Sequence, residues 1–267
     1  MSAATREPVI EVRNLVTHYG SRKILDDVSL TVYAGEIMVI MGGSGSGKST
    51  LMRHMTGLEV PTSGTVWVLG KDLAELTREE GFELRRKMGV AFQTGALFSS
   101  MNVGENIMLP LRELADLDEN TMEIMMRMKL EVVDLAGFEE LMPAELSGGM
   151  VKRAAMARAI VMDPKILFCD EPSSGLDPVV ASALDDLILK LRDAMQMTII
   201  VVTHELESAF KIADRITVLD QGEILAVDVP EAIRNSPNAR IQNLIHRRPE
   251  TQRIDPHEYL QRLTGEA

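Results

Sequence analysis

The chain has 267 residues and a formal net charge of −12, and this acidic balance argues against nucleic-acid binding driven by phosphate neutralisation. Its single cysteine, Cys169, excludes an internal disulfide and suits a reducing compartment. The first residues lack the apolar stretch of a signal peptide, and no apolar run approaches the roughly 20 residues that span a bilayer, so we expect neither feature.

Two strands are expected near the start of the chain. Residues 9–15 alternate between apolar and polar side chains, and residues 25–32 place Val28, Leu30 and Val32 on one face. Tyr19 falls between them, on an expected loop. An aromatic side chain there could stack on an adenine base. Taken alone, Tyr19 is more typical of a packed turn aromatic.

The next segment predicts a phosphate-binding loop. An apolar run at 37–41 indicates a buried strand, residues 50–55 indicate a helix, and the intervening sequence follows the pattern G-x-x-x-x-G-K-[ST]. Glycines let backbone N–H groups approach phosphate oxygens, and the helix N-terminus adds partial positive charge. Lys48 is expected to reach the β- and γ-phosphates, and the Ser49 hydroxyl to ligate Mg²⁺. The residues expected to bind ATP here are Gly42, Gly43, Ser44, Gly45, Ser46, Gly47, Lys48, Ser49 and Thr50.

The middle of the chain changes from strands to helices. Strands are expected at 64–70 and 88–92, with a charged helix at 78–86 between them. Gln93 follows the second strand, where its amide can reach a metal or an attacking water, although such a residue alone is typical of a solvated loop. From about 103 to 160 the pattern is helical, which indicates a helical insertion in an α/β plan.

A second potential phosphate site opens the last helix of this insertion. Pro143 breaks the preceding pattern, and Ser147, Gly148 and Gly149 then form a favourable helix N-terminus with approachable backbone.

Two carboxylates and a histidine follow buried strands of an expected parallel sheet. The run 166–171 ends in Asp170 and Glu171, and adjacent side chains of a strand point in opposite directions. We therefore expect Asp170 to hold Mg²⁺ and Glu171 to polarise the attacking water. His204 follows the strand at 197–202, where it can contact a γ-phosphate, although a lone histidine is more often structural. Asp177 is expected in a turn before a helix at 179–191.

The rest of the chain carries no further candidate for the site. Residues 216–227 are expected to form a hairpin, and the arginine-bearing segment after Pro230 is typical of a solvated extension.

Together, these segments resemble an ATP-binding-cassette (ABC) ATPase over residues 9–229. Residues 42–49 match the family's Walker A loop, 146–149 its signature, and 174–177 its D-loop. Tyr19, Gln93 and His204 match the family's adenine-stacking aromatic, Q-loop glutamine and switch histidine. Because the motifs follow in the family's order, we prefer these roles to the purely structural interpretation of each residue taken alone. Met150 departs from the glutamine that most members carry.

The resemblance implies a fold and a set of partners. The fold is α/β: a P-loop (RecA-like) core with an antiparallel β subdomain and a helical subdomain at about 95–160, within an ATPase domain spanning residues 1–239. The resemblance also implies ATP and Mg²⁺ as cofactors and no nucleic acid as a partner. It further implies a head-to-tail homodimer in which the partner's ATP is contacted by Ser147, Gly148, Gly149 and Asp177. Such a dimer works on a separate membrane permease, which would dock near residues 93–111, and it is peripheral on the cytoplasmic face of the inner membrane.

Residues 142–150 and the arginine-bearing tail resemble the ATPases of maintenance-of-lipid-asymmetry (Mla) systems, which move phospholipid between the two membranes of Gram-negative bacteria. This resemblance implies a mammalian-cell-entry (MCE) class binding protein, a STAS-domain protein, and an extension at 240–267 that clasps the dimer or a partner. Two alternatives stay open: an ABC importer for an amino acid or a metal, and a non-transport ABC protein acting on ribosomes or DNA.

Overall fold

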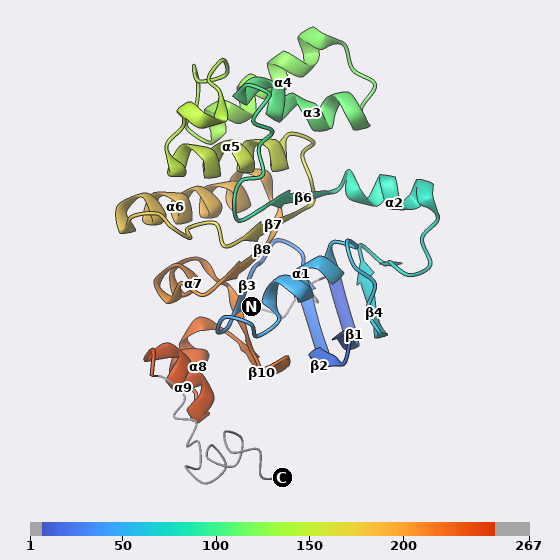
Figure 1. Ribbon diagram of the computed structural model, residues 1–267, viewed down its shortest axis with the longest axis vertical. Helices are drawn as coiled ribbons and strands as arrows, with labels where there is room; N and C mark the ends of the chain where they lie inside the picture. Colours follow the sequence, from blue (N-terminus) through green and yellow to red (C-terminus); the bar gives the residue numbers. More distant parts are fainter. Residues whose placement is uncertain (1–6, 249–267) are drawn as a thin grey trace, which may run out of the picture.

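Two β-sheets support the helices in the computed structural model, which describes residues 7–248 (Figure 1). The larger sheet has six strands in the order β10-β9-β3-β8-β7-β6, and its neighbouring strands are parallel except for the β9–β10 hairpin. Its strands are β3 (Ile37–Met41), β6 (Met88–Ala91), β7 (Ile166–Asp170), β8 (Thr198–Thr203), β9 (Arg215–Asp220) and β10 (Glu223–Asp228).

The larger sheet is covered on both faces, as the continuous apolar runs of β3 and β8 require. Successive side chains of a strand point to opposite faces. Met38 and Ile40 accordingly pack into one core with the smaller sheet and the helix α1 (Lys48–Met55), while Ile37 and Val39 pack into a second core with the other helices. The phosphate-binding loop therefore joins β3, which is buried on both of its faces, to α1, which packs against one of these two faces.

The smaller sheet is antiparallel, with the order β2-β1-β4-β5. Its strands are β1 (Pro8–Tyr19), β2 (Arg22–Tyr33), β4 (Ser63–Val68) and β5 (Lys71–Asp72), and α2 (Arg78–Arg85) leads from it to β6. Val28, Leu30 and Val32 are buried on one face of β2, which confirms the expected pattern. Tyr19, expected on a loop, is the last residue of β1, because the β1–β2 ladder extends to the pair Tyr19–Arg22.

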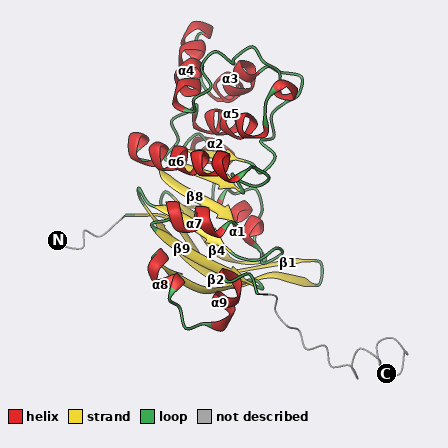
Figure 2. Cartoon of the chain, turned by 90° about the vertical axis from the view of Figure 1, so that its left-hand side faces the viewer, coloured by secondary structure: helices red, strands yellow, loops and turns green. Residues whose placement is uncertain are grey.

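The helical insertion lies at one end of the molecule in both views (Figures 1 and 2). It contains α3 (Val103–Leu114), α4 (Glu119–Val132), a 3-10 turn at Pro143–Glu145 and α5 (Gly148–Ile160). Polar N-caps start these helices: the side chains of Asn102, Asp118 and Ser147 each accept a backbone N–H from the first turn. The remaining helices are α6 (Pro178–Met195), α7 (Leu206–Ile212), α8 (Pro230–Arg234) and α9 (Ala239–Ile245).

The prediction that Glu171 belongs to a strand is wrong. β7 ends at Asp170, and Glu171 follows with a φ of 47°, in the left-handed region. Its N–H still donates to the carbonyl of Val202 at 2.8 Å, as the last bond between β7 and β8. Because Glu171 does not have a strand conformation, the strand alternation that we expected for Asp170 and Glu171 does not apply to this pair.

Candidate active site

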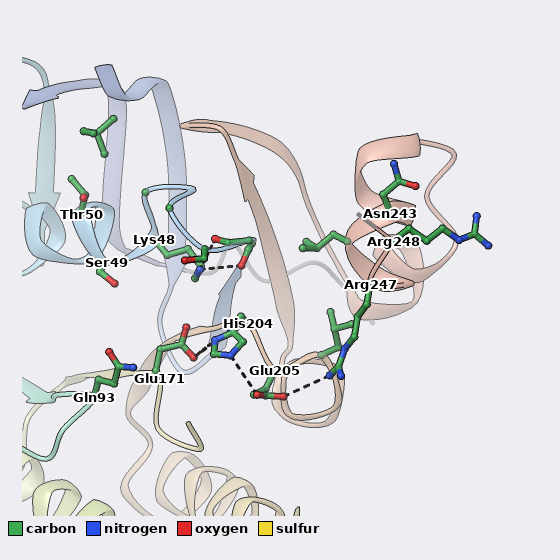
Figure 3. Close-up of a pocket in the computed structure, with 18 of the residues that line it drawn as sticks. Lys48, Ser49, Thr50, Gln93, Glu171, His204, Glu205, Asn243, Arg247 and Arg248 are labelled. Carbon is green, nitrogen blue, oxygen red and sulfur yellow. Dashed lines mark hydrogen bonds and ion pairs between the residues drawn. The ribbon is translucent and has the colours of Figure 1, made fainter. Parts of the chain in front are cut away.

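A cavity of about 950 Å³ opens beyond the carboxyl ends of the parallel strands. The loop after β3, the residues after β6, β7 and β8, and the end of α9 surround it (Figure 3). Ligands of open α/β sheets bind at this edge. The predicted site residues that line it are Tyr19, Gly42, Gly43, Ser44, Gly45, Gly47, Lys48, Ser49, Thr50, Gln93, Glu171 and His204.

The loop over residues 42–47 needs glycine at two positions for identifiable reasons. Gly47 has a φ of 104°, and a Cβ there would lie 2.6 Å from Leu25 Cδ2. A Cβ on Gly42 would lie 2.0 Å from the carbonyl oxygen of Leu219. Gly47 is also the N-cap of α1 and offers no side chain, so the backbone N–H groups of the first turn stay available to an anion.

Lys48 is buried at the start of α1 and folds back onto the loop. Its Nζ donates to the carbonyl oxygens of Gly42 and Gly43, each at 2.9 Å. Burial lowers the pKa of Lys48, while the charges of Glu171 and Asp170 raise it. The ammonium group thus faces the loop that is expected to receive phosphates, with two carboxylates nearby.

Ser49, which lines the cavity, and Asp170, which does not, form a pair of oxygen donors at the start of α1 and the end of β7. The Ser49 hydroxyl is hydrogen-bonded to the Asp170 carboxylate, whose Oδ1 is buried with no hydrogen-bond partner among the described residues. Burial and the charge of Glu171 raise the pKa of Asp170, so the carboxylate lacks full compensation in the free protein. A hydroxyl and an under-compensated carboxylate fit Mg²⁺, which takes one or two carboxylates and completes its shell with water and substrate phosphates.

Glu171 and His204 contact each other directly. His204 Nδ1 lies 2.8 Å from Glu171 Oε2, which also accepts bonds from the Thr203 hydroxyl at 3.3 Å and the His204 N–H at 3.4 Å. Within residues 7–248, these side-chain contacts of Glu171 all use Oε2, and the residue lines the cavity. The arrangement suits a carboxylate that orients a water at the cavity wall.

Gln93 and Tyr19 lie on the cavity wall. The backbone carbonyl of Gln93 accepts a hydrogen bond from Lys152 of α5, while the residue itself lines the cavity. Tyr19 is 44% exposed, and its hydroxyl donates to Glu59 Oε2 at 2.8 Å. This hydrogen bond to Glu59 holds the Tyr19 ring at the rim of the cavity.

The signature residues Ser147, Gly148 and Gly149 and the turn residue Asp177 do not line this cavity. Ser147 caps α5, and Asp177 caps α6 by accepting the N–H groups of Val179 and Val180. A Cβ on Gly149 would lie 2.6 Å from Val180 Cγ1, so this glycine permits α5 to pack against α6. The structure of one subunit therefore does not bring these four residues to the nucleotide loop of the same subunit.

Sequence reasoning missed several residues that line the cavity. These are Arg22, Ile24, Glu205, Leu206, Asn243, Leu244, Arg247 and Arg248. Arg247 lies 3.8 Å from Glu205, which in turn lies 3.4 Å from His204 (Figure 3). The arginine pair at 247–248 was visible in the sequence, but its position next to the loop depends on how α9 folds back.

A glycine loop between a buried strand and a helix, with two carboxylates at the end of another strand of the same sheet, defines a P-loop nucleotide-binding ATPase. The family model described as "ABC transporter" matches residues 25–174. The chain belongs to the ABC transporter family, as one of its ATP-hydrolysing subunits, and it binds ATP.

Two groups of curated relatives match most of the chain. The intermembrane phospholipid transport system ATP-binding protein MlaF of Haemophilus influenzae is 40% identical over 87% of this chain and 88% of its own length. MlaF of Escherichia coli K12 is 38% identical over 89% of this chain and 88% of its own. The probable ribonucleotide transport ATP-binding protein mkl of Mycobacterium bovis is 39% identical over 90% of this chain and 67% of its own.

Solved structures agree with the fold. The dimeric ATP-binding cassette MJ0796, in a post-hydrolysis state with ADP and Pi, superposes with a TM-score of 0.76 at 30% identity, over 83% of this chain and 98% of its own. CbiO1 of Clostridium perfringens, from the transporter complex cbiONQ, has a TM-score of 0.78 at 28% identity, over 90% of this chain and 99% of its own. These matches confirm the predicted α/β fold with a P-loop core.

Proposed function

We propose that this chain powers phospholipid transport between the inner and outer membranes of a Gram-negative bacterium. The observation that carries the proposal is the nucleotide cavity of an ABC ATPase in a chain that is 38–40% identical to MlaF proteins over most of its length. The cavity supports ATP hydrolysis, and the relatives support the cargo.

ATP binding uses the loop and the residues around it. The backbone N–H groups of residues 43–49 contact the β- and γ-phosphates, and Lys48 exchanges its bonds to Gly42 and Gly43 for phosphate oxygens. Tyr19 stacks on the adenine from the rim of the cavity. Ser49, Asp170 and Gln93 would hold Mg²⁺, which would supply positive charge beside the phosphates.

Hydrolysis uses Glu171 and His204. Glu171 accepts a hydrogen bond from the attacking water and polarises it, while the nearby His204 restrains the carboxylate and contacts the γ-phosphate. The Thr203 hydroxyl helps to hold Glu171 Oε2 in place. The other carboxylate oxygen is then available to the water.

The complete site needs a second copy of the chain. Ser147, Gly148, Gly149 and Asp177 lie away from the cavity of their own subunit, so a head-to-tail homodimer brings them to the partner's ATP. The dimeric MJ0796 cassette, bound to ADP and Pi, supports such an assembly. ATP binding closes the dimer and hydrolysis opens it.

The work of this cycle passes to a separate membrane permease. None of the helices among residues 7–248 has the length and apolarity to cross a bilayer. A groove of about 400 Å³ lies beside the Q-loop, and its lining includes Phe92, Phe98, Leu109, Pro110 and Leu114. Phe92 is 39% exposed and Phe98 is 52% exposed, so an apolar segment of the permease has a surface to bury. We place the dimer peripherally on the cytoplasmic face of the inner membrane.

The cargo assignment favours phospholipid over the alternatives. The segment 142–150, with Met150 in place of glutamine, and the identity to two MlaF proteins both support it. The comparable identity to mkl, named as a probable ribonucleotide transporter subunit, makes another cargo the second candidate. An MCE-class binding protein and a STAS-domain protein complete the proposed assembly.

We further propose a division into an ATPase domain, 1–239, and an extension, 240–267, that clasps the dimer or the STAS partner. Within the described part, Arg240 anchors α9 to the end of β9 through Asp220 Oδ2 at 2.5 Å. Residues 249–267 lie outside the described residues. Deleting 249–267 and measuring the dimer mass and ATPase activity tests the clasp: a loss of dimer is expected, and unchanged values for both would contradict it.

The test of the proposed function is affinity purification of the full-length chain from its native membrane in detergent, with mass spectrometry of bound proteins and lipids. A permease, an MCE protein, a STAS-domain protein and co-purified phospholipid are expected. A different permease without lipid would remove the cargo assignment and leave the ATPase assignment standing.

A further inference from the structure

Lys152 is a buried lysine on α5 that contacts two catalytic segments. It is 9% exposed and follows the N-cap Ser147 by five residues, about 7.5 Å along the helix axis. Its Nζ donates to the backbone carbonyl oxygen of Gln93 and, at 3.1 Å, to that of Glu171. A buried ammonium group needs such partners, and here both partners belong to residues of the active site.

The two carbonyl groups occupy equivalent places on neighbouring strands. The β6–β7 ladder ends with the pair Ala91–Cys169, and Gln93 and Glu171 each follow two residues later. Glu171 has left the ladder with a φ of 47°, a conformation that a non-glycine residue keeps only where its surroundings hold it. Lys152 therefore connects two strand ends where the ladder no longer does.

The restraints on Glu171 come from two different parts of the molecule. Its N–H bonds to Val202, and its carboxylate contacts Thr203 and His204, all on or directly after β8. Its carbonyl is held by Lys152, which belongs to the helical insertion. A movement of α5 relative to the sheet thus acts on the backbone of Glu171 through Lys152.

The Q-loop is fastened to the same helix. The guanidinium of Arg158, also on α5, donates to the carbonyl oxygens of Gly95 at 2.9 Å and Ala96 at 2.8 Å. A Cβ on Gly95 would lie 2.7 Å from Val151 Cγ1, so the loop approaches α5 closely. Residues 93–96 are therefore attached to the helix that begins at the signature.

We propose that Lys152 is a positioning residue that makes Gln93 and Glu171 follow the movement of α5. This inference rests on the proposed function, in which the N-terminus of α5 contacts the partner's ATP and Glu171 polarises water in its own site. ATP bound in one subunit then sets the catalytic geometry of the other, through the partner's signature and Lys152. The consequence is positive cooperativity of ATP hydrolysis between the two sites.

The test compares Lys152→Met with Lys129→Met in the full-length chain, purified with the membrane proteins that accompany it. Lys129 is a matched control on α4: it is 8% exposed and bonds to Asp163 at 2.5 Å, away from the cavity. Methionine keeps the length of the side chain and removes the donors. ATPase rate is measured against ATP concentration, and affinity is measured with a fluorescent ATP analogue.

For Lys152→Met we expect kcat to fall about 10–100-fold, analogue affinity to stay within about twofold, and the Hill coefficient to fall from above 1 to 1. Lys152→Arg, which keeps a cationic donor, should recover part of kcat and of the cooperativity. Lys129→Met should retain the wild-type Hill coefficient. If Lys152→Met does not fold, Lys152→Gln replaces it, with a smaller loss expected because the shorter neutral amide cannot hold both carbonyls.

Three results would overturn the proposal: a wild-type Hill coefficient of 1, a wild-type kcat in Lys152→Met or its replacement, or equal losses in the Lys152 and Lys129 variants. The proposed function fails separately. If Glu171→Gln hydrolysed ATP at the wild-type rate, the water-polarising role would be wrong whatever Lys152 does.

Discussion

Replacing Lys48 by methionine separates phosphate binding from folding. In the free protein, Nζ of Lys48 bonds to the carbonyl oxygens of Gly42 and Gly43 at 2.9 Å, and burial lowers its pKa. Binding ATP replaces these carbonyl contacts with phosphate contacts. The gain is the difference between two sets of charge-assisted bonds, about 1.5–3 kcal/mol, so Lys48→Met should weaken ATP affinity about 10–150-fold.

The same substitution should change stability little. The variant loses two hydrogen bonds but no longer buries an ammonium group, and these effects offset each other to within about 1 kcal/mol. For a chain of this size that corresponds to a shift in Tm of no more than about 4 °C.

Calorimetric titration with ATP and thermal unfolding without nucleotide measure the two quantities. Lys190→Met is the control, because Lys190 also bonds to a backbone carbonyl, that of Val132 at 3.4 Å, away from the cavity. Wild-type ATP affinity and hydrolysis in Lys48→Met, or a collapse of its Tm, would refute the reasoning.

Three further substitutions test other parts of the site. Glu171→Gln should keep ATP binding, slow hydrolysis about 10²–10⁴-fold and trap an ATP-bound dimer, read by light scattering; a wild-type rate would contradict the role of Glu171. Ser147→Arg should abolish activity, yet random mixing with Lys48→Met chains should recover at most about a quarter of it, because half of the dimers then hold one intact site of two and the proposed coupling between sites lowers the rate of that single site; no recovery would contradict the shared site. Asp170→Asn should raise the Tm of the nucleotide-free protein near neutral pH, because burial and Glu171 raise the pKa of Asp170. A raised pKa means that the folded state binds more protons, so wild-type stability from this group falls as pH rises through the raised pKa; the advantage of Asp170→Asn should therefore shrink as pH falls, and a constant advantage would contradict it.

Local patterns predicted the parts of the site that lie within one stretch of chain. The phosphate loop needs only the strand before it, the helix after it and glycines such as Gly42 and Gly47 between them, and all of these are adjacent in sequence. The N-cap role of Ser147 is local in the same way. The buried strands of the larger sheet could be predicted because strands of a parallel sheet, which are covered on both faces, have continuous apolar runs.

The parts that the sequence did not predict depend on contacts between distant segments. Lys152 meets Gln93 across 59 residues, and Arg247 meets Glu205 because α9 folds back beside the loop. Glu171 looked like a strand residue because it directly follows the apolar run of β7, and nothing in that run signals the φ of 47° at the next position. Tyr19 looked like a loop residue because its β1 segment carries polar side chains next to Gly20.

The most direct measurement reconstitutes the chain, with the membrane proteins that co-purify with it, into vesicles that hold a fluorescent phospholipid. Transfer of that lipid to acceptor vesicles is followed with ATP, without ATP, and with the Glu171→Gln chain. Transfer that depends on ATP and stops in Glu171→Gln is expected. ATP hydrolysis at full rate with no phospholipid movement in either direction would contradict the assignment of this ATPase to phospholipid transport.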